Sequence, residues 1–144
     1  MTCLPHAFDT NVLAYADGVL ETDADIVKRK AAWDLIGTVI EQGTPLFVPA
    51  QVLIELHDLL VRKRRLPRDD AAASIALWQQ RFDVIPTSTA VLDAAMELSA
   101  RHKMRIFDAI ILAAASEVRC DILYSEDMQH GFAWRGVEVV NPFL

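Results

Sequence analysis

The sequence predicts a three-layer α/β fold, with helices on both faces of a mostly parallel central sheet. Short runs rich in β-branched and aromatic residues alternate along the chain with longer segments of helical character. Parallel neighbours need a long crossover connection, which is usually a helix, so this alternation favours a parallel sheet. No repeat, low-complexity tract or Gly/Ser linker interrupts the 144 residues, and we therefore expect a single domain over 1–144.

Short apolar runs are expected to form the strands of this sheet. They lie at residues 7–8, 46–48, 82–85, 122–124 and 137–140. Val, Ile, Leu, Phe and Tyr make up most of these runs, which is typical of strands buried on both faces. In open parallel sheets ligands bind beyond the carboxyl ends of the strands. We therefore expect the functional site at that edge.

The helices between these strands have recognisable start and stop signals. Gly43 follows the segment 24–42 and is a favoured residue just after a helix end. Pro67 stands where the helix 50–65 cannot continue, and a further Ala-rich helix is expected at 69–81. Ser88 is a plausible cap for a helix that runs to about residue 103. The last expected helix, 107–118, is almost wholly apolar and should be buried on most sides.

Composition excludes a disulfide scaffold and a membrane span. Hydrophobic residues make up 53% and charged residues 24% of the chain, close to ordinary globular usage. No stretch approaches the roughly 18 uninterrupted apolar residues that a span requires, and the N-terminal residues lack signal-peptide features. Cys3 and Cys120 form no CxxC pair. A reduced, cytoplasmic location is the simplest expectation.

The formal net charge of −6 at first argues against a nucleic-acid partner, but positive charge is concentrated locally. Five of the fourteen Lys and Arg residues fall within 62–68, at the end of an expected helix. Positive charge suits a helix C-terminus and is often merely solvated. The alternative is a contact with RNA or a protein partner, for which the candidates are Arg62, Arg64, Arg65 and Arg68.

Two acidic residues lie just after the ends of expected strands. Asp9 follows the first strand, and Asp127 follows the strand 122–124 after two intervening residues. Both positions lie at the edge where a site is expected. The alternative interpretation is helix capping, because Asp, Asn, Thr and Ser are the usual N-cap residues. Either segment alone leaves both interpretations open.

Asp108 and Glu55 are two further candidates. Asp108 is the only polar residue between Ile106 and Ala115, and a carboxylate in an apolar helix is costly unless something compensates its charge. A bound divalent cation would compensate that charge more than a helix N-terminus does. Glu55 falls on the flank of the apolar face of helix 50–65, beside Asp58 and Arg62. For Glu55 an ordinary ion-pair stripe on the helix surface is an equal alternative.

Taken together, the four carboxylates indicate a metal-assisted reaction. With few histidines and no cysteine pair, the donors are carboxylate oxygens, which suit Mg²⁺ or Mn²⁺ and not zinc. Crowded carboxylates repel one another unless a cation or protons hold them together. A site of this kind can activate water and stabilise the charge of an attacked phosphate.

The sequence resembles the PIN-domain ribonucleases over nearly its whole length. Residues 8–13 (FDTNVL) resemble the opening motif of that family, and residues 51–56 (QVLIEL), 107–111 (FDAII) and 123–127 (LYSED) resemble its later acidic motifs. The ending at residues 139–143 (VVNPF) resembles the VapC-type toxins within the family. Each motif is loose by itself, but four in the family's order are a strong signal.

The resemblance implies a PIN-like fold and a Mg²⁺-dependent endoribonuclease, the toxin of a VapBC-type toxin–antitoxin pair. It also implies an RNA substrate, a VapB-like antitoxin partner and a homodimer. By motif position, the acidic quartet would be Asp9, Glu55, Asp108 and Asp127. Asn11 and Ser125 would orient the carboxylates or metal-bound water. Motif position favours Asp127 over its neighbour Glu126, and a short Asp is held more rigidly near an octahedral Mg²⁺.

Other functions fit the sequence less well. A phosphatase of the haloacid-dehalogenase type needs a second acid two residues after Asp9, where this chain has Asn11. A response-regulator receiver needs a phosphate-accepting Asp after the central strand and a late Lys, and neither is evident. A PIN-like domain kept only for binding RNA or protein remains the main alternative, although the intact quartet argues against it.

Overall fold

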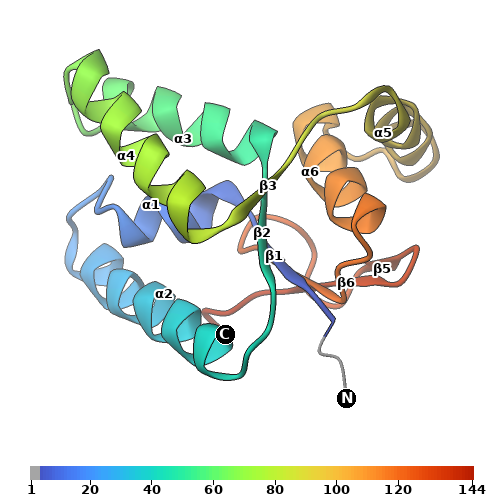
Figure 1. Ribbon diagram of the computed structural model, residues 1–144, viewed down its shortest axis with the longest axis horizontal. Coiled ribbons are helices and arrows are strands. Elements are labelled where there is room, and N and C mark those ends of the chain that lie inside the picture. Colours follow the sequence, from blue (N-terminus) through green and yellow to red (C-terminus); the bar gives the residue numbers. More distant parts are fainter. Residues whose placement is uncertain (1–3) are drawn as a thin grey trace.

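The computed structural model describes residues 4–144, which form a six-stranded sheet between two layers of helices (Figure 1). The strand order is β3-β2-β1-β4-β6-β5. All neighbours pair in parallel except β5 and β6, which form an antiparallel hairpin at one edge. The strands are β1 (His6–Phe8), β2 (Leu46–Pro49), β3 (Asp83–Ile85), β4 (Ile122–Tyr124), β5 (Ala133–Trp134) and β6 (Val137–Val140).

The helices lie on both sides of the strands. Figure 1 shows the first four helices to the left of the central strands and the last two to the right. The left-hand helices are α1 (Thr10–Ala16), α2 (Asp23–Glu41), α3 (Ala50–Arg62) and α4 (Arg68–Arg81). The right-hand helices are α5 (Thr89–His102) and α6 (Ile106–Glu117). The predicted three-layer α/β/α fold with a mostly parallel sheet is therefore confirmed.

Local capping explains where the long helices begin and end. The Thr22 hydroxyl accepts a hydrogen bond from the Asp25 backbone N–H, and the Asp25 carboxylate accepts one from the Thr22 backbone N–H, so a capping box starts α2. Gly43 adopts φ 73° after this helix, as its position predicts, because glycine has no Cβ to oppose that backbone. Ser88 caps α5 through a 3.2 Å bond from the Val91 backbone, again as predicted.

Some elements differ from the sequence-based expectation. Helix α1 and strand β5 were not predicted, because α1 has only seven residues and β5 only two, too few to give a periodic pattern. The helix expected at 50–65 ends at Arg62, and Arg65 already has φ 63°. The Leu66 amide donates to the Leu60 carbonyl, which closes the helix end before Pro67 starts α4.

The sheet topology brings the ends of two strands together at a reversal point. From β1 the chain proceeds to β2 and β3 on one side, and later to β4 and β6 on the other. Phe8 of β1 pairs with Tyr124 of β4, so Asp9 and Ser125 follow neighbouring strands at the same edge. Ligands in open α/β sheets bind at such reversals. The predicted location of the site therefore coincides with the crevice that this topology creates.

The core is continuous through the sheet and both helical layers. Ala7 and Phe8 of β1 and Leu123 of β4 are fully buried, and half of the residues of α6 are buried as well. Phe8 stacks on Phe82 with ring centroids 5.2 Å apart, which joins the centre of the sheet to the end of α4. Within residues 4–144, none of the helices is both long and apolar enough to span a membrane.

Candidate active site

Asp9 lies at the centre of the candidate site and is almost completely buried, with 3% of its surface exposed. It caps α1, and its Oδ1 accepts a 2.6 Å hydrogen bond from the Thr10 backbone. Its Oδ2 accepts bonds from the Ser125 hydroxyl at 2.6 Å and from the Asn11 amide at 3.3 Å. The capping interpretation is therefore correct for Asp9, but its second carboxylate oxygen also accepts from Ser125, in the turn after β4.

Burial raises the pKa of Asp9 from 3.8 to about 6. The hydrogen bonds from Ser125 and Thr10 act in the opposite direction, and the nearby charges of Asp108 and Asp127 raise the pKa further. Removing a carboxylate from water favours its neutral form, and like charges add to this effect. Asp9 is thus a buried acid whose negative charge is unfavourable unless a positive charge lies close to it.

Asn11 connects Asp9 with Asp127. Its amide nitrogen lies 3.3 Å from Asp9 Oδ2 and 3.2 Å from Asp127 Oδ2, and its carbonyl oxygen accepts a 3.0 Å bond from the Glu126 backbone. One side chain therefore fixes both the turn after β4 and the carboxylate of Asp127. Asn11 occupies the place that its motif predicts, although its predicted role in orienting the carboxylates stays a prediction.

Glu126 belongs to a different set of contacts. Its carboxylate pairs with Lys28 of α2 and accepts a hydrogen bond from the Tyr15 hydroxyl. The Tyr15 ring in turn packs edge-on against Phe143, with centroids 5.1 Å apart. These contacts hold Glu126 against α1 and α2, whereas Asp127 faces Asn11. The geometry thus separates the two neighbouring acids, one toward Asp9 and one away from it.

Glu55 and Asp108 approach the same crevice from α3 and α6. Glu55 Oε2 accepts a 2.7 Å hydrogen bond from the Thr10 hydroxyl. Asp108 lies in the first turn of α6, and its side chain is 19% exposed. The ion pair expected on the surface of α3 is formed by Asp58 and Arg62, which lie 2.7 Å apart. Glu55 takes no part in that pair.

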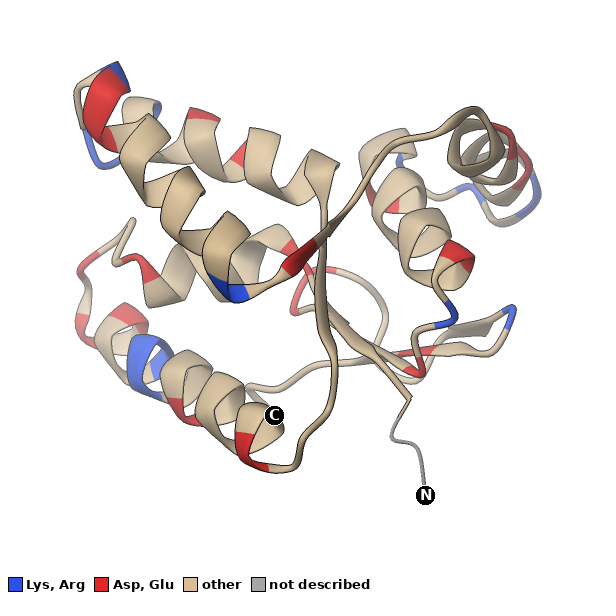
Figure 2. Ribbon diagram, in the orientation of Figure 1, with Lys and Arg blue, Asp and Glu red and all other residues tan. Residues whose placement is uncertain are grey.

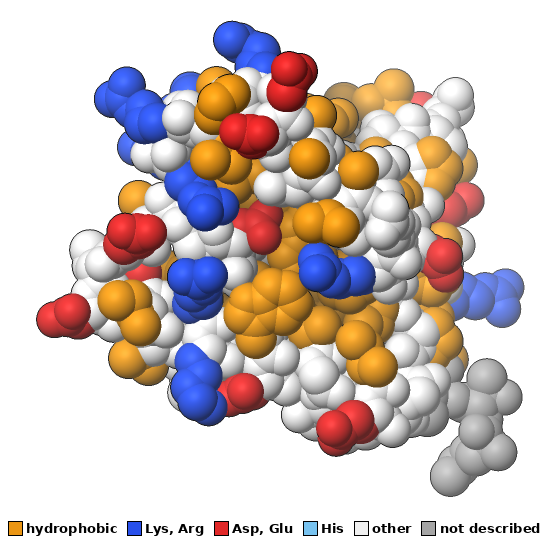
Figure 3. Space-filling view, turned by 60° about the vertical axis from the view of Figure 1, so that its left-hand side comes forward, with side chains coloured by type: hydrophobic (Ala, Val, Ile, Leu, Met, Phe, Trp, Pro, Cys, Tyr) orange, Lys and Arg blue, Asp and Glu red, His pale blue; other side chains and the backbone are white. Residues whose placement is uncertain are grey.

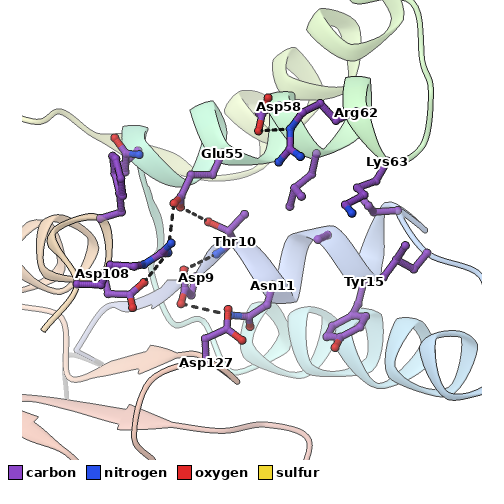
Figure 4. A pocket seen from close by; sticks show the side chains of 17 residues that line it. Asp9, Thr10, Asn11, Tyr15, Glu55, Asp58, Arg62, Lys63, Asp108 and Asp127 are labelled. Atoms are coloured by element: carbon purple, nitrogen blue, oxygen red, sulfur yellow. Dashed lines mark hydrogen bonds and ion pairs between the residues drawn. The ribbon is translucent and has the colours of Figure 1, made fainter.

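All four predicted acids line one pocket of about 520 Å³. Figure 4 shows Glu55 and Asp108 facing the pocket from separate helices, with Asp9 and Asp127 on the side of the strand ends. Arg62 and Lys63 line the same pocket, as do the apolar side chains of Val19, Leu20 and Leu59. The structure therefore brings the sequence-predicted quartet together.

The basic segment 62–68 is only partly at this pocket. Arg62 and Lys63 line it, whereas the exposed Arg64 and Arg65 of the α3–α4 turn and Arg68 at the start of α4 are not part of its wall. Figure 2 shows Lys and Arg at this turn and on α2. In Figure 3 basic side chains lie along one side of the face shown, with acidic side chains between them. The five basic residues of segment 62–68 form a local basic edge, although the chain as a whole is acidic.

The chemistry of the donor set fits a hard divalent cation. Three Asp and one Glu contribute only oxygen donors, and burial of Asp9 makes a neighbouring positive charge favourable. In the part of the chain that the structure describes, however, no three acidic, His or Cys side chains are already close enough to form a metal-binding group. Hydrogen bonds and ion pairs now hold the quartet oxygens, so metal binding requires side-chain adjustment.

Some residues at the site were not predicted from the sequence. Thr10 bonds to Glu55, and Arg105 lies 3.2 Å from Asp108 and 3.8 Å from Glu55. The position of Arg105, three residues before Asp108, is a signal for a helical ion pair that could have been recognised. Lys28 gave no such signal, because its partner Glu126 is 98 residues away in sequence.

The PIN-domain family model matches residues 7–132, and the chain belongs to this family. The match spans the strand ends and helices that carry all four acids of the quartet. The resemblance that the four sequence motifs indicated is thereby confirmed. No curated protein sequence gives a significant match to the chain.

Similar folds occur among solved toxin–antitoxin structures. The chain is similar to VapBC2 from Rickettsia felis bound to a promoter DNA fragment, with a TM-score of 0.65, 13% identity, and coverage of 86% of this chain and 89% of that one. VapC20 from Mycobacterium tuberculosis, described as a sarcin–ricin loop cleaving toxin, matches with a TM-score of 0.64, 20% identity, and coverage of 85% of this chain and 89% of that one. A toxin–antitoxin complex from Klebsiella pneumoniae matches with a TM-score of 0.63, 21% identity, and coverage of 95% of this chain and 97% of that one.

Proposed function

We propose that this chain is a Mg²⁺-dependent endoribonuclease that hydrolyses RNA phosphodiester bonds, with Mn²⁺ as a possible substitute metal. The observation that carries the proposal is the meeting of four carboxylates from separate elements in one pocket, at the reversal point of a parallel sheet. Membership of the PIN-domain family and the similarity to VapC20, a toxin described as cleaving the sarcin–ricin loop, support the same function.

The four acids would hold the cation, and neighbouring residues would orient them. Bound there, a divalent cation would supply charge that activates a water and stabilises the attacked phosphate. Asp9, Asp108, Asp127 and Glu55 would be its ligands, directly or through water. Asn11 restrains Asp9 and Asp127 together, and Ser125 restrains Asp9 through its hydroxyl. Such restraint keeps carboxylates in the geometry that Mg²⁺ demands.

The basic edge would guide the RNA backbone toward the pocket. Arg62 and Lys63 lie on the pocket wall, and Arg64 and Arg65 in the α3–α4 turn and Arg68 at the start of α4 continue the positive charge. Arg and Lys neutralise phosphates, and contacts to phosphate carry no base specificity. This arrangement would bring the backbone, and not the base edges, to the carboxylates.

A VapB-like antitoxin is the proposed protein partner, and the solved complexes with similar folds support this assignment. Leu20 is 53% exposed, and it lines the pocket together with Val19 and Leu59. An apolar wall next to an acidic quartet suits a peptide that combines apolar and basic residues. The family resemblance further implies a homodimer and a cytoplasmic location. Light scattering of the purified chain tests whether it is a homodimer.

The proposed activity is tested with an end-labelled RNA in Mg²⁺, in Mn²⁺ and in EDTA. We expect cleavage with either cation and none in EDTA. Glu55→Gln and Asp58→Asn form a matched pair, because both acids lie on α3 at the pocket but only Glu55 belongs to the quartet. We expect Glu55→Gln to slow cleavage by about 100-fold or more, and Asp58→Asn to change it only a few-fold.

Other outcomes separate this proposal from its alternatives. Cleavage that continues undiminished in EDTA would exclude a metal-dependent mechanism. RNA binding without cleavage, under every metal condition and with a folded protein, would favour a PIN-like binding module. Release of phosphate from phosphate monoesters, with intact RNA, would favour a phosphatase.

A further inference from the structure

Arg105 holds the position between two acids of the quartet. Its Nη2 lies 3.2 Å from Asp108 Oδ1 and 3.8 Å from Glu55 Oε1. Within residues 4–144, Arg105 is the only Lys or Arg side chain in an ion pair with any quartet acid. Arg62, the other arginine that lines the pocket, pairs instead with Asp58.

The contacts of Arg105 are of a kind that breaks easily. Its side chain is 64% exposed, and ion pairs exposed to this extent are weak because water screens them. Arg105 is the N-cap residue of α6, but its side chain makes no capping bond, so the helix does not need it in this position. The guanidinium can therefore leave the carboxylates without disturbing the helix.

A divalent cation and the guanidinium would compete for the same oxygens. Mg²⁺ draws its ligand oxygens to about 2.1 Å and demands near-octahedral geometry. Glu55 Oε1 and Asp108 Oδ1, the oxygens nearest to Arg105, face the pocket in which the quartet meets. A second positive charge between these carboxylates would also repel the cation. Binding of metal to Glu55 and Asp108 thus requires that Arg105 moves away.

A displaced Arg105 would remain on the wall of the pocket, because its backbone is fixed at the start of α6. Its long side chain would then present a planar, permanently charged group next to the metal. Guanidinium groups bind phosphate oxygens in a bidentate manner, with better geometry than lysine provides. An RNA phosphate that reaches the quartet is a ligand of matching charge.

We propose that Arg105 is an exchanging counter-ion: it neutralises Glu55 and Asp108 in the metal-free protein, and it binds an RNA phosphate once a divalent cation has displaced it. This inference rests on the proposed function. It adds that metal binding and RNA binding are coupled through one side chain, which neither the family match nor the fold implies. Arg105 is thus a positioning residue in the free enzyme and a phosphate ligand in the complex.

The first test is Mn²⁺ binding, measured by calorimetry without RNA for the wild type, Arg105→Gln, Arg105→Lys and Arg62→Gln. Removing the competing charge is expected to tighten Mn²⁺ binding about fivefold in Arg105→Gln, which corresponds to one exposed ion pair. Arg105→Lys keeps the charge and should resemble the wild type. Arg62→Gln is the matched control on the same pocket and should also leave the affinity unchanged.

The second test is RNA binding, measured with Ca²⁺ in place of Mg²⁺ and again in EDTA, with a gel to verify that the RNA stays intact. In EDTA, where Arg105 pairs with carboxylates, wild type and Arg105→Gln should bind RNA equally. With Ca²⁺, Arg105→Gln should bind several-fold more weakly. Equal losses in both conditions would overturn the exchange, because Arg105 would then contact RNA whether metal is bound or not.

Failure of this inference is distinguishable from failure of the proposed function. If the wild type and Arg105→Gln bind Mn²⁺ with equal affinity, the metal site stands and the competition by Arg105 is wrong. If neither protein binds Mn²⁺, the metal-dependent function is wrong and the exchange with it. Weaker Mn²⁺ binding by Arg105→Gln would also overturn the proposal, because it would mean that Arg105 supports the site.

Discussion

Glu126 and Asp127 are adjacent in sequence, but their carboxylates belong to separate networks. Glu126 is held by Lys28 and Tyr15, whereas Asp127 Oδ2 lies 3.2 Å from the amide of Asn11. Because Asn11 also contacts Asp9, the carboxylate of Asp127 is coupled to the centre of the pocket, whereas Glu126 reaches Asn11 only through its backbone N–H. The carboxylates of the two neighbouring acids therefore have different partners.

Replacement of these two acids should have very different effects on cleavage. We expect Asp127→Asn to reduce kcat/KM by roughly 100-fold or more, because it removes a proposed metal ligand. Glu126→Gln keeps the size of the side chain and its bond to Tyr15, and it should cost less than about tenfold. Rates are compared after circular dichroism has verified both folds. A larger loss from Glu126→Gln would reverse the assignment, and equally large losses would place both acids at the metal.

Ser125→Ala tests the support of Asp9. The Ser125 hydroxyl donates to Asp9 Oδ2 at 2.6 Å and accepts from the Met128 backbone at 3.1 Å, and Ser125 is fully buried. Its loss leaves the buried Met128 amide without this acceptor and Asp9 Oδ2 with only the longer bond from Asn11, so we expect a destabilisation of about 1–3 kcal/mol in urea unfolding. Cleavage should fall by about 10- to 100-fold, as is typical when a residue that hydrogen-bonds a metal ligand is removed. Wild-type stability together with wild-type cleavage would contradict this role.

The raised pKa of Asp9 predicts a pH-dependent stability of the metal-free protein. The pKa is about 6 in the folded protein against 3.8 for a free carboxyl, so the folded state binds the proton more tightly. This contribution to stability is complete below about pH 4 and is lost as the pH rises through 6. Asp9→Asn abolishes this titration. Its free energy of unfolding in EDTA, relative to wild type, should increase by up to about 3 kcal/mol from pH 4 to pH 7.

That measurement uses urea unfolding at several pH values, and added Mg²⁺ gives its internal check. The proposed cation would stabilise the wild type at pH 7. It should therefore lower the free energy of unfolding of Asp9→Asn relative to that of the wild type. A difference between the two proteins that stays constant from pH 4 to pH 7 would show that the charge of Asp9 is already compensated in the free protein.

Neutralising Arg64 and Arg65 together tests the basic edge. Both are exposed on the α3–α4 turn, outside the pocket wall. If they contact RNA, Arg64→Gln/Arg65→Gln should weaken binding and reduce the salt dependence by about one unit for each lost phosphate contact. Arg119→Gln/Arg135→Gln is the matched control, because Arg119 follows the opposite end of α6 from Asp108 and Arg135 lies in the β5–β6 hairpin. If RNA binding by the two double variants has the same salt dependence, Arg64 and Arg65 do not contact RNA, and the α3–α4 turn is an ordinary solvated helix end.

The sequence predicted the alternation of strands and helices because short β-branched runs and capped apolar helices carry local signals. Gly43 and Ser88 act at helix ends as their residue types predict. The topology then brings Asp9 beside Ser125, as the rule for parallel strand ends requires. Positions within the fold were therefore predictable wherever one residue type strongly favours one backbone geometry.

Contacts between distant side chains could not be predicted in this way. The ion pair of Lys28 with Glu126 joins α2 to the turn after β4, and neither residue carries a local sign of its partner. The exposed Arg105 could equally have pointed into solvent, and only the approach of α3 toward α6 places Glu55 near it. Helix α1 is too short for a periodic pattern, although Asp9 supplies its cap. These features depend on tertiary packing, which overrides local propensity.

The central position of β1 has a consequence for the order of events during synthesis. β1 can pair with β2 once residue 49 is made, but its other neighbour, β4, contains residues 122–124. Ser125 and Asp127 can reach Asp9 and Asn11 only after that late strand has docked. A nascent chain that stops short of β4 holds an incomplete set of acids, however well its first half has folded. The pocket that holds the four acids would therefore be complete only after the segment 122–127 has emerged and docked.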